Sequence, residues 1–167
     1  MRRVLIGGAL GVLVVSLAAC GSSSSKSASE QAVQQRADLW SIDQIEKNFH
    51  KATSTKDIDL MMSLWAPNAT FTYGPGETAT GKRQIRRAWL IENKNFRPAF
   101  HKVSETLAYK VRVTASGDRG TLYFECHYVD VKTKEFGPIV AADLDVARIN
   151  GHWLITNLVG APATLTP

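Results

Sequence analysis

The chain has 167 residues and a formal net charge of +5, and its Lys and Arg residues form no block of five or more. This length is typical of one globular domain with a short extension, and the scattered positive charge does not indicate a nucleic-acid-binding surface. We therefore expect a single domain without a nucleic-acid partner.

Residues 1–19 have the features of a signal peptide. Two arginines follow Met1, and the apolar run over residues 4–18 is shorter than a membrane-spanning helix, which needs about 20 residues. Residues 17–20, Leu-Ala-Ala-Cys, resemble the lipobox of bacterial lipoproteins, whose cysteine receives a lipid and becomes the new N-terminus. The resemblance implies cleavage before Cys20 and lipid on that cysteine. The chain would then be held in the cell envelope, on the outer face of the cytoplasmic membrane or on the outer membrane. The alternative is an ordinary signal peptide beside a chance cysteine.

Residues 20–35 have the composition of a flexible tether. Four consecutive serines follow Gly21, and a segment with so few apolar side chains cannot bury enough surface to fold. The domain is then expected over residues 36–162. With Cys20 used for lipid, Cys126 has no partner for a disulfide within the chain, and we expect it to behave as a small buried apolar residue.

Apolar side chains recur at helical spacing in three segments of the first hundred residues. The first segment, residues 41–52, predicts an amphipathic helix. Asp57 has the character of an N-cap for a second, short helix that ends before Pro67. A third helix is predicted over residues 82–92, directly after Gly81.

Period-two alternation is typical of strands and dominates the rest of the chain. Residues 69–73 have this pattern, with Phe71 and Tyr73 on one face. Further strands are predicted over residues 100–103, 107–114, 121–131, 139–149 and 153–159, with hairpin turns at Gly117-Asp118 and Asn150-Gly151. Helices followed by a run of long antiparallel strands predict an α+β fold, in which a strongly bent sheet with helices on one side forms a cone.

Five segments carry a resemblance to a known superfamily. They are residues 56–59 (Lys-Asp-Ile-Asp), 64–71 (Leu-Trp-Ala-Pro-Asn-Ala-Thr-Phe), 80–82 (Thr-Gly-Lys), 116–119 (Ser-Gly-Asp-Arg) and 148–155 (Arg-Ile-Asn-Gly-His-Trp-Leu-Ile). Their order and spacing resemble the SnoaL-like and nuclear transport factor 2-like superfamily. The resemblance implies a cone-shaped, strongly curved antiparallel sheet with three N-terminal helices (a cystatin-like α+β barrel), an apolar pocket, and homodimers through the open sheet face. Members include cofactor-free isomerases, dehydratases and cyclases beside binding modules without chemistry, so the fold alone does not settle the function.

Ketosteroid isomerases resemble the first half of the chain but lack a counterpart of their chemistry in it. The position of their general-base aspartate falls on Tyr73, and that of their oxyanion-binding tyrosine falls on Phe49. Only their second oxyanion donor is matched, by Asp145. A site without the base cannot abstract a proton beside a carbonyl by that route. We therefore expect no ketosteroid isomerase activity.

Scytalone dehydratases resemble the chain at more positions of their site. Their pocket tyrosine matches Tyr73, and two of their histidines fall on His101 and near His127. The aspartate that orients a histidine in those enzymes is replaced by Ser54. The tyrosine and both histidines, together with Asp145, would form a water-eliminating acid/base set, because histidine titrates near neutral pH. The alternative is that the tyrosine is a pocket wall and that both histidines are hydrogen-bonded residues of the sheet.

Three hypotheses for the function follow. The first is a membrane-anchored module that binds a small, mostly apolar ligand in the cone, the second is a cofactor-free lyase or isomerase that uses the acid/base set above, and the third is a dimerising envelope scaffold. The candidate ligand-binding residues are Phe49, Trp65, Phe71, Tyr73, Trp89 and Asp143, although we expect the two tryptophans to pack in the core beneath the sheet. Asp143 shares a strand face with Asp145 and points either to solvent or into the cone. We expect no metal site and no cofactor, because histidine pairs at ligand spacing, a phosphate loop and a dinucleotide fingerprint are all missing from the sequence.

Overall fold

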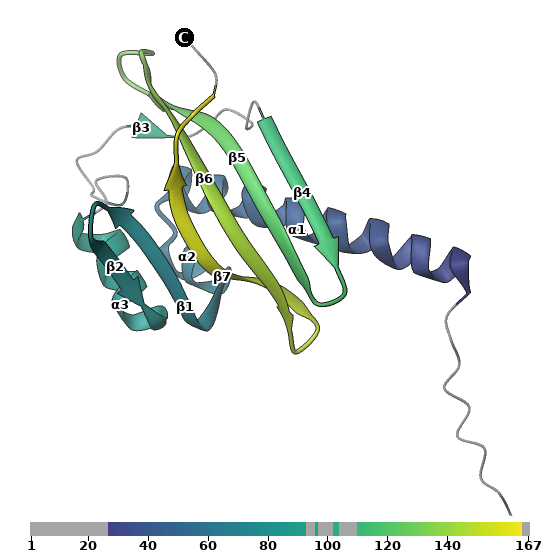
Figure 1. Cartoon of the computed structure of the whole chain (residues 1–167). Helices are drawn as coiled ribbons and strands as arrows, with labels where there is room; N and C mark the ends of the chain where they lie inside the picture. The colour runs from purple at the N-terminus through teal and green to yellow at the C-terminus, as the bar shows by residue number, and fades with distance from the viewer. Residues whose placement is uncertain (1–26, 93–95, 97–101, 104–109, 165–167) are drawn as a thin grey trace, which may run out of the picture.

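The structure is a computed structural model that describes residues 27–92, 96, 102–103 and 110–164. Three helices, α1 (Ala28–Thr55), α2 (Ile58–Ser63) and α3 (Gly81–Arg87), pack with a curved sheet of seven strands. Helix α1 crosses the far side of the sheet in Figure 1, and α3 lies beside β1 and β2. The predicted α+β class, with helices covering one face of a bent sheet, is confirmed.

Helix α1 begins much earlier than the sequence pattern predicts, at Ala28 instead of Ser41. Its first turn is closed by a capping box, in which the Ser27 backbone N–H donates to the Glu30 carboxylate (2.7 Å) and the Glu30 backbone N–H donates to the Ser27 hydroxyl (3.3 Å). Residues 28–35, part of the predicted tether, are therefore helical. They contain no Gly or Pro to interrupt a helix, but they carry no apolar period that would reveal one.

The second helix begins where the sequence predicts it but ends earlier than expected. Asp57 is the N-cap of α2, where its side chain accepts from the backbone N–H groups of Asp59 (3.1 Å) and Leu60 (2.9 Å). Trp65, predicted as helical, is instead the first residue of β1 (Trp65–Gly74) and pairs with Ile155. After α3 the chain continues in a π-helical turn, η1 (Ala88–Glu92).

The sheet has the strand order β2-β1-β7-β6-β5-β3, with β4 also paired to β5. The strands not yet given are β2 (Glu77–Thr80), β3 (Lys102–Val103), β4 (Lys110–Ser116), β5 (Arg119–Asp130), β6 (Phe136–Ile149) and β7 (His152–Ala161). Both predicted hairpin turns are confirmed. Gly117 links β4 to β5, and Asn150 and Gly151 link β6 to β7, all with the positive φ that tight hairpins require.

Two features of the sheet differ from the expected antiparallel barrel. Strands β1 and β7 run parallel, because the chain crosses the whole domain between them, whereas the other pairings are antiparallel. Strand β2 lies at one edge and β3 and β4 lie at the other, and no pairing joins these edges in the described part of the chain. The sheet is therefore a curved, open one and not a closed barrel.

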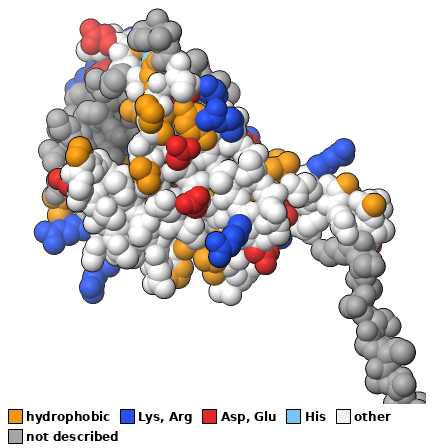
Figure 2. All heavy atoms as spheres, in the orientation of Figure 1, with side chains coloured by type: hydrophobic (Ala, Val, Ile, Leu, Met, Phe, Trp, Pro, Cys, Tyr) orange, Lys and Arg blue, Asp and Glu red, His pale blue; other side chains and the backbone are white. Residues whose placement is uncertain are grey.

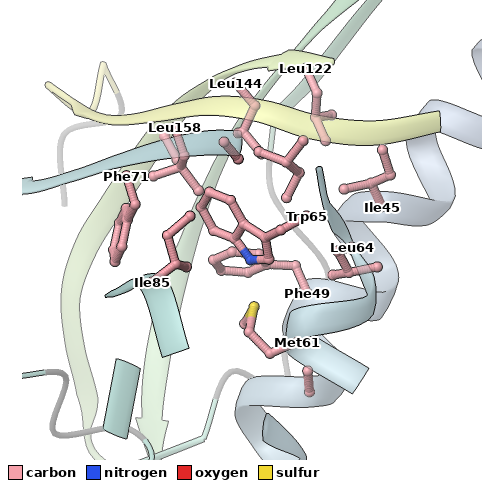
Figure 3. Close-up of a cluster of buried hydrophobic side chains, with 14 of the residues drawn as sticks. Ile45, Phe49, Met61, Leu64, Trp65, Phe71, Ile85, Leu122, Leu144 and Leu158 are labelled. Carbon is pink, nitrogen blue, oxygen red and sulfur yellow. The ribbon is translucent and has the colours of Figure 1, made fainter. Parts of the chain in front are cut away.

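The hydrophobic core fills the space between the concave sheet face and the helices. Figure 3 shows Phe49 from α1, Met61 from α2, Ile85 from α3 and Trp65 from β1 converging there, with strand leucines above them. Burial of such apolar side chains is the main stabilising term of a fold of this size. No helix among the described residues is long and apolar enough to cross a membrane.

Candidate functional site

The floor of the cone is one connected cluster of aromatic rings. Phe71 stacks on Trp89 with ring centroids 5.0 Å apart and an interplanar angle of 8°. Phe49 meets Trp89 edge-on at 5.4 Å and lies 5.5 Å from Phe124, and Trp65 lies 5.6 Å from Phe71. All five residues are buried. Four of the six predicted ligand-binding residues thus form one apolar wall, part of which Figure 3 shows.

Tyr73 extends this wall to the rim of the cone. Its ring lies 5.3 Å from that of Phe71 on the same strand, while 38% of the residue is exposed to solvent. Strand β1 therefore carries aromatic rings from the fully buried Trp65 to the solvent-exposed Tyr73.

A titratable pair lies within this aromatic interior. Glu46 and His50 are four residues apart on α1 and are 3% and 7% exposed, and His50 Nδ1 is hydrogen-bonded to the Glu46 carboxylate. The imidazole ring also meets Phe124 edge-on at 5.1 Å and Phe49 at 6.2 Å. Neither Glu46 nor His50 was among the predicted site residues. The signal for them was their spacing within the stripe of inward-facing residues that Ile42 and Phe49 define.

The environment of His50 favours its charged form. Burial lowers the pKa of His50, but its interactions with Cys126 and Glu46 outweigh burial and raise the pKa to about 9. The ring is therefore protonated at neutral pH, and both nitrogens carry a hydrogen. Glu46 takes one of them, whereas Nε2 is buried and meets no hydrogen-bond partner of good geometry among the described residues.

Two further N–H donors in the cone are buried without a hydrogen-bond acceptor among the described residues. They are the indole Nε1 atoms of Trp65 and Trp89. Buried polar groups are almost always hydrogen-bonded to protein, water or ligand. Cys126 is buried as expected, at 1% exposure, with His50 as its polar neighbour. No group of three His, Cys, Asp or Glu side chains is placed to bind a metal ion within the described residues.

The two aspartates of β6 do not point into the cone. Asp143 and Asp145 are exposed and alternate with the buried Ala142, Leu144 and Val146, so they lie on the face of the sheet opposite the core. Asp145 accepts a hydrogen bond from the Asn157 side-chain amide (3.2 Å). The prediction that Asp143 lines the ligand pocket is therefore wrong, and neither aspartate borders the cone.

His127 lies on the same outer face, because it has the opposite orientation to Cys126 on β5. Its Nδ1 is within hydrogen-bond distance of the Gly137 carbonyl oxygen (3.1 Å), and its ring meets Phe136 at 5.6 Å. Asp145 on β6 is paired with Thr121 on β5. Thr121 is six residues from His127 on the same strand, so Asp145 and His127 are roughly 20 Å apart. His101 lies outside the described residues. The structure thus does not bring Tyr73, His127 and Asp145 together in one site.

A second buried carboxylate, Glu125, serves the outer face of the sheet. It accepts hydrogen bonds from the Tyr123 hydroxyl and from both the Thr164 hydroxyl (2.6 Å) and the Thr164 backbone N–H (3.1 Å). The hydrogen bond to Glu125 raises the pKa of Tyr123. This network holds the C-terminal segment against β5, and it leaves Glu125 saturated with donors. We assign it a structural role.

The outer face also carries a shallow groove of about 820 Å³ near the β4–β5 and β6–β7 turns, lined by Thr114, Arg119, Thr121, Asp145, Arg148 and Thr156 among others. Figure 2 views this side of the sheet, where charged side chains are few and scattered among uncharged atoms. Such a surface is unlike the aromatic interior of the cone. The two faces of the sheet are therefore chemically distinct, and only the inner one has the apolar character expected of a ligand pocket.

Comparison with known proteins identifies the family. The model of the SnoaL-like domain matches residues 47–155, and no curated protein matches the chain with significance. A nuclear transport factor 2-like (NTF2-like) protein with a cystatin-like fold from Novosphingobium aromaticivorans is 17% identical with a TM-score of 0.65, over 83% of this chain and 88% of its own. A proposed dehydratase of the NTF2-like family from Streptomyces avermitilis is 15% identical with a TM-score of 0.60, over 78% and 99%. A proposed ketosteroid isomerase from Shewanella frigidimarina is 15% identical with a TM-score of 0.58, over 72% and 94%.

These structural similarities show that the present chain shares the fold of the three proteins. At such low sequence identity they show nothing about its activity. The family match spans more than half of the sequence, from the middle of α1 to the middle of β7. The protein therefore belongs to the SnoaL-like domain family and has the cystatin-like fold of NTF2-like proteins.

Proposed function

We propose that the protein is a lipid-anchored binding module that holds a small, mostly apolar molecule in the cone of its sheet. The observation that carries the proposal is the aromatic cluster around His50, whose buried Nε2 makes no hydrogen bond of good geometry among the described residues and has only the Cys126 thiol as a polar neighbour. Aromatic walls with a few convergent polar groups are characteristic of small-molecule sites.

The polar groups of the cone narrow the chemistry of the ligand. His50, Trp65 and Trp89 offer donors, so the ligand should supply an acceptor oxygen. A buried donor without a partner costs about 1–3 kcal/mol, which an acceptor oxygen would recover. Because Glu46 already pairs with His50, a neutral carbonyl oxygen suits the site better than a carboxylate. A hydrophobic ketone or ester fits this description.

Displacement of the apolar dye Nile red tests this ligand class. We expect a straight-chain ketone to displace the dye about tenfold more tightly than its parent alkane, as one recovered hydrogen bond implies, and more tightly than the matching carboxylate. His50→Gln should remove the preference for the ketone, whereas His152→Gln, at the exposed start of β7, should keep it. Equal displacement by ketone and alkane in the unaltered protein would contradict the assignment of His50 as the polar contact.

The anchoring part of the proposal rests on residues 17–20 and their resemblance to a lipobox. Cells that express the chain are fed radiolabelled palmitate, and the protein is examined on a gel. We expect Cys20→Ser to abolish the label and Cys126→Ser, at the other cysteine, to retain it. Equal labelling of the two variants would overturn the lipid anchor while leaving the cone site open to its own test.

A second candidate function, cofactor-free acid/base catalysis, is favoured by the Glu46–His50 pair. A histidine that is protonated at neutral pH, among apolar aromatic rings, could act as a general acid toward a carbonyl or leaving hydroxyl. This pair replaces the predicted acid/base set, whose described members do not converge. In the loss of water from a β-hydroxy ketone, Glu46 would take the α-proton and His50 would protonate the leaving hydroxyl. Turnover of such a ketone to the unsaturated ketone, abolished in His50→Gln, would support this candidate. Binding without turnover would favour the binding module.

We also propose that two copies pair through the outer sheet face, as the resemblance to the superfamily implies. Sedimentation analysis of the chain at high micromolar concentration tests this point. A dimer that loads no ligand would favour the envelope scaffold, and a strictly monomeric species would remove both the dimer and the scaffold.

A further inference from the structure

The N-terminal half of α1 projects beyond the sheet and carries an apolar stripe on its outer side. Val33 is 67% exposed and Trp40 is 64% exposed, with the exposed Ala37 between them. Spacings of four and three residues place the three side chains on one face of the helix. Figure 1 shows this half of α1 extending past β4, and Figure 2 shows hydrophobic side chains at the surface of the same projection.

The rotation of this helix is fixed by contacts on its other side. Gln35 donates from its side-chain amide to the Ala115 carbonyl oxygen (2.9 Å). Asp38, which is 6% exposed, accepts from Arg148 (2.6 Å) and from the Trp153 indole N–H (3.3 Å). These bonds join α1 to the β4–β5 and β6–β7 hairpins. The stripe of Val33, Ala37 and Trp40 therefore faces outward in the folded domain and cannot turn inward without breaking them.

The position of the stripe along the chain identifies its occupant. Ser27 lies seven residues after Cys20, so the start of α1 is at most about 25 Å from the lipid-bearing cysteine even when the segment is fully extended. Arg36 is exposed, one residue before Ala37 on the helix surface. Tryptophan is enriched at the membrane–water interface, and long cationic side chains reach lipid phosphates from an apolar face. A lipid surface thus matches the length of the tether, the exposed Trp40 ring and the positive charge of Arg36.

We propose that Val33, Ala37 and Trp40 form a lipid-docking stripe, which rests on the bilayer once the lipid on Cys20 holds the chain there. The inference depends on the anchoring in the proposed function and goes beyond it by fixing the orientation of the domain. Helix α1 lies along the membrane, Trp40 enters the headgroup region, and Arg36 contacts phosphate. The outer face of the sheet is then turned away from the lipid.

Tryptophan fluorescence tests the inference in the lipidated, full-length mature chain reconstituted in phosphatidylcholine–phosphatidylglycerol vesicles. Trp40 is the only tryptophan of the chain that is exposed, since Trp65, Trp89 and Trp153 are 0%, 2% and 8% exposed. Lipids brominated near the headgroup should quench the Trp40 emission. We expect Trp40→Phe to lose the quenching and Val33→Ser to weaken it. Phe136→Ser, which removes an equally exposed ring (66%) from β6, should leave the quenching unchanged.

Vesicle flotation, measured in parallel, separates the two proposals. Protein that fails to float would overturn the anchor and the docking stripe together. Protein that floats but whose tryptophan emission brominated lipid does not quench would overturn the stripe and leave the anchor intact. A blue shift of the Trp40 emission that rises with protein concentration in the absence of vesicles would show that a second copy covers the stripe, which also overturns lipid docking.

Discussion

His50 is the residue whose protonation should dominate the pH dependence of stability. Its pKa rises from 6.5 to about 9 on folding, through interactions with Glu46 and Cys126 that outweigh burial. A raised pKa in the folded state stabilises the protein fully below pH 6.5, and this contribution is lost as the pH rises through about 9. A shift of this size corresponds to about 3 kcal/mol.

Urea unfolding on either side of that pH window measures the effect. We expect the free energy of unfolding to fall as the pH rises across the window, and the fall to disappear in His50→Gln. His152→Gln should retain it, because this histidine is exposed at the start of β7. A stability that stays constant across the window in the unaltered protein would refute the charged state of His50.

Phe49 and Tyr73 mark the inside and the rim of the cone, and their substitutions should differ accordingly. Phe49 is 5% exposed and packs against Trp89, so Phe49→Ala should cost about 3–5 kcal/mol. Tyr73→Phe should change the stability little, because the residue is 38% exposed. Thermal melts of both variants make the comparison. The reverse order of the two losses would mean that the inner and outer sides of β1 are interchanged.

At the scale of residues, the sequence predicts the apolar part of the site better than its polar part. The burial of Phe49, Trp65, Phe71 and Trp89 follows from helical and strand periodicity, which is a local property. Glu46 and His50 lie at positions where the helical period points inward, but their polar side chains favour exposure to solvent. Their burial depends on Phe124 and Cys126, which the fold brings from a distant strand. Such a contact leaves no local signal in a single sequence.

At the scale of elements, α1 approaches the β4–β5 hairpin closely at Gly120, through Ile42. A Cβ atom added there would lie 2.4 Å from the Thr114 carbonyl oxygen and 2.8 Å from Ile42 Cδ1. Gly120→Ala should therefore destabilise the protein by about 1–3 kcal/mol, the usual cost of overpacking. Gly160→Ala is the matched control, because nothing lies within 4 Å of a Cβ atom at this strand position.

Chemical unfolding of the two glycine variants decides the point. We expect the midpoint of Gly120→Ala to fall clearly and that of Gly160→Ala to stay or to rise slightly, since alanine restricts the unfolded chain. Equal midpoints would show that α1 lies further from the sheet than the structure places it.

The elements that could be predicted are those with a local cause. The Asp57 cap and both hairpin turns depend on a few adjacent residues with distinctive conformational preferences. The early start of α1 and the parallel β1–β7 pairing were not predictable in this way. The former is stabilised by a capping box in a segment without apolar period, and the latter joins residues that are far apart in the sequence.

At the scale of the whole molecule, the protein is a curved, open sheet whose two faces differ. Its inner face and the helices enclose an aromatic interior with buried donors, and its outer face carries an open groove lined by hydroxyl and charged side chains. Helix α1 belongs to both proposed sites. Its C-terminal half contributes Glu46, Phe49 and His50 to the cone, and its N-terminal half carries the lipid-docking stripe. A single rigid helix would then set the direction in which the cone faces the bilayer.

The most direct test of the central claim is native mass spectrometry of the lipidated protein purified from its own membranes. We expect the mass of the complex to exceed that of the lipid-modified chain by one small molecule. This molecule should depart at raised collision energy while the covalent lipid remains. Phe49→Ala should lower its occupancy, and Phe136→Ser, on the exterior, should not. Protein that carries only its covalent lipid, and that also fails to take up any apolar ketone added in excess, would contradict the claim that the cone is a ligand site.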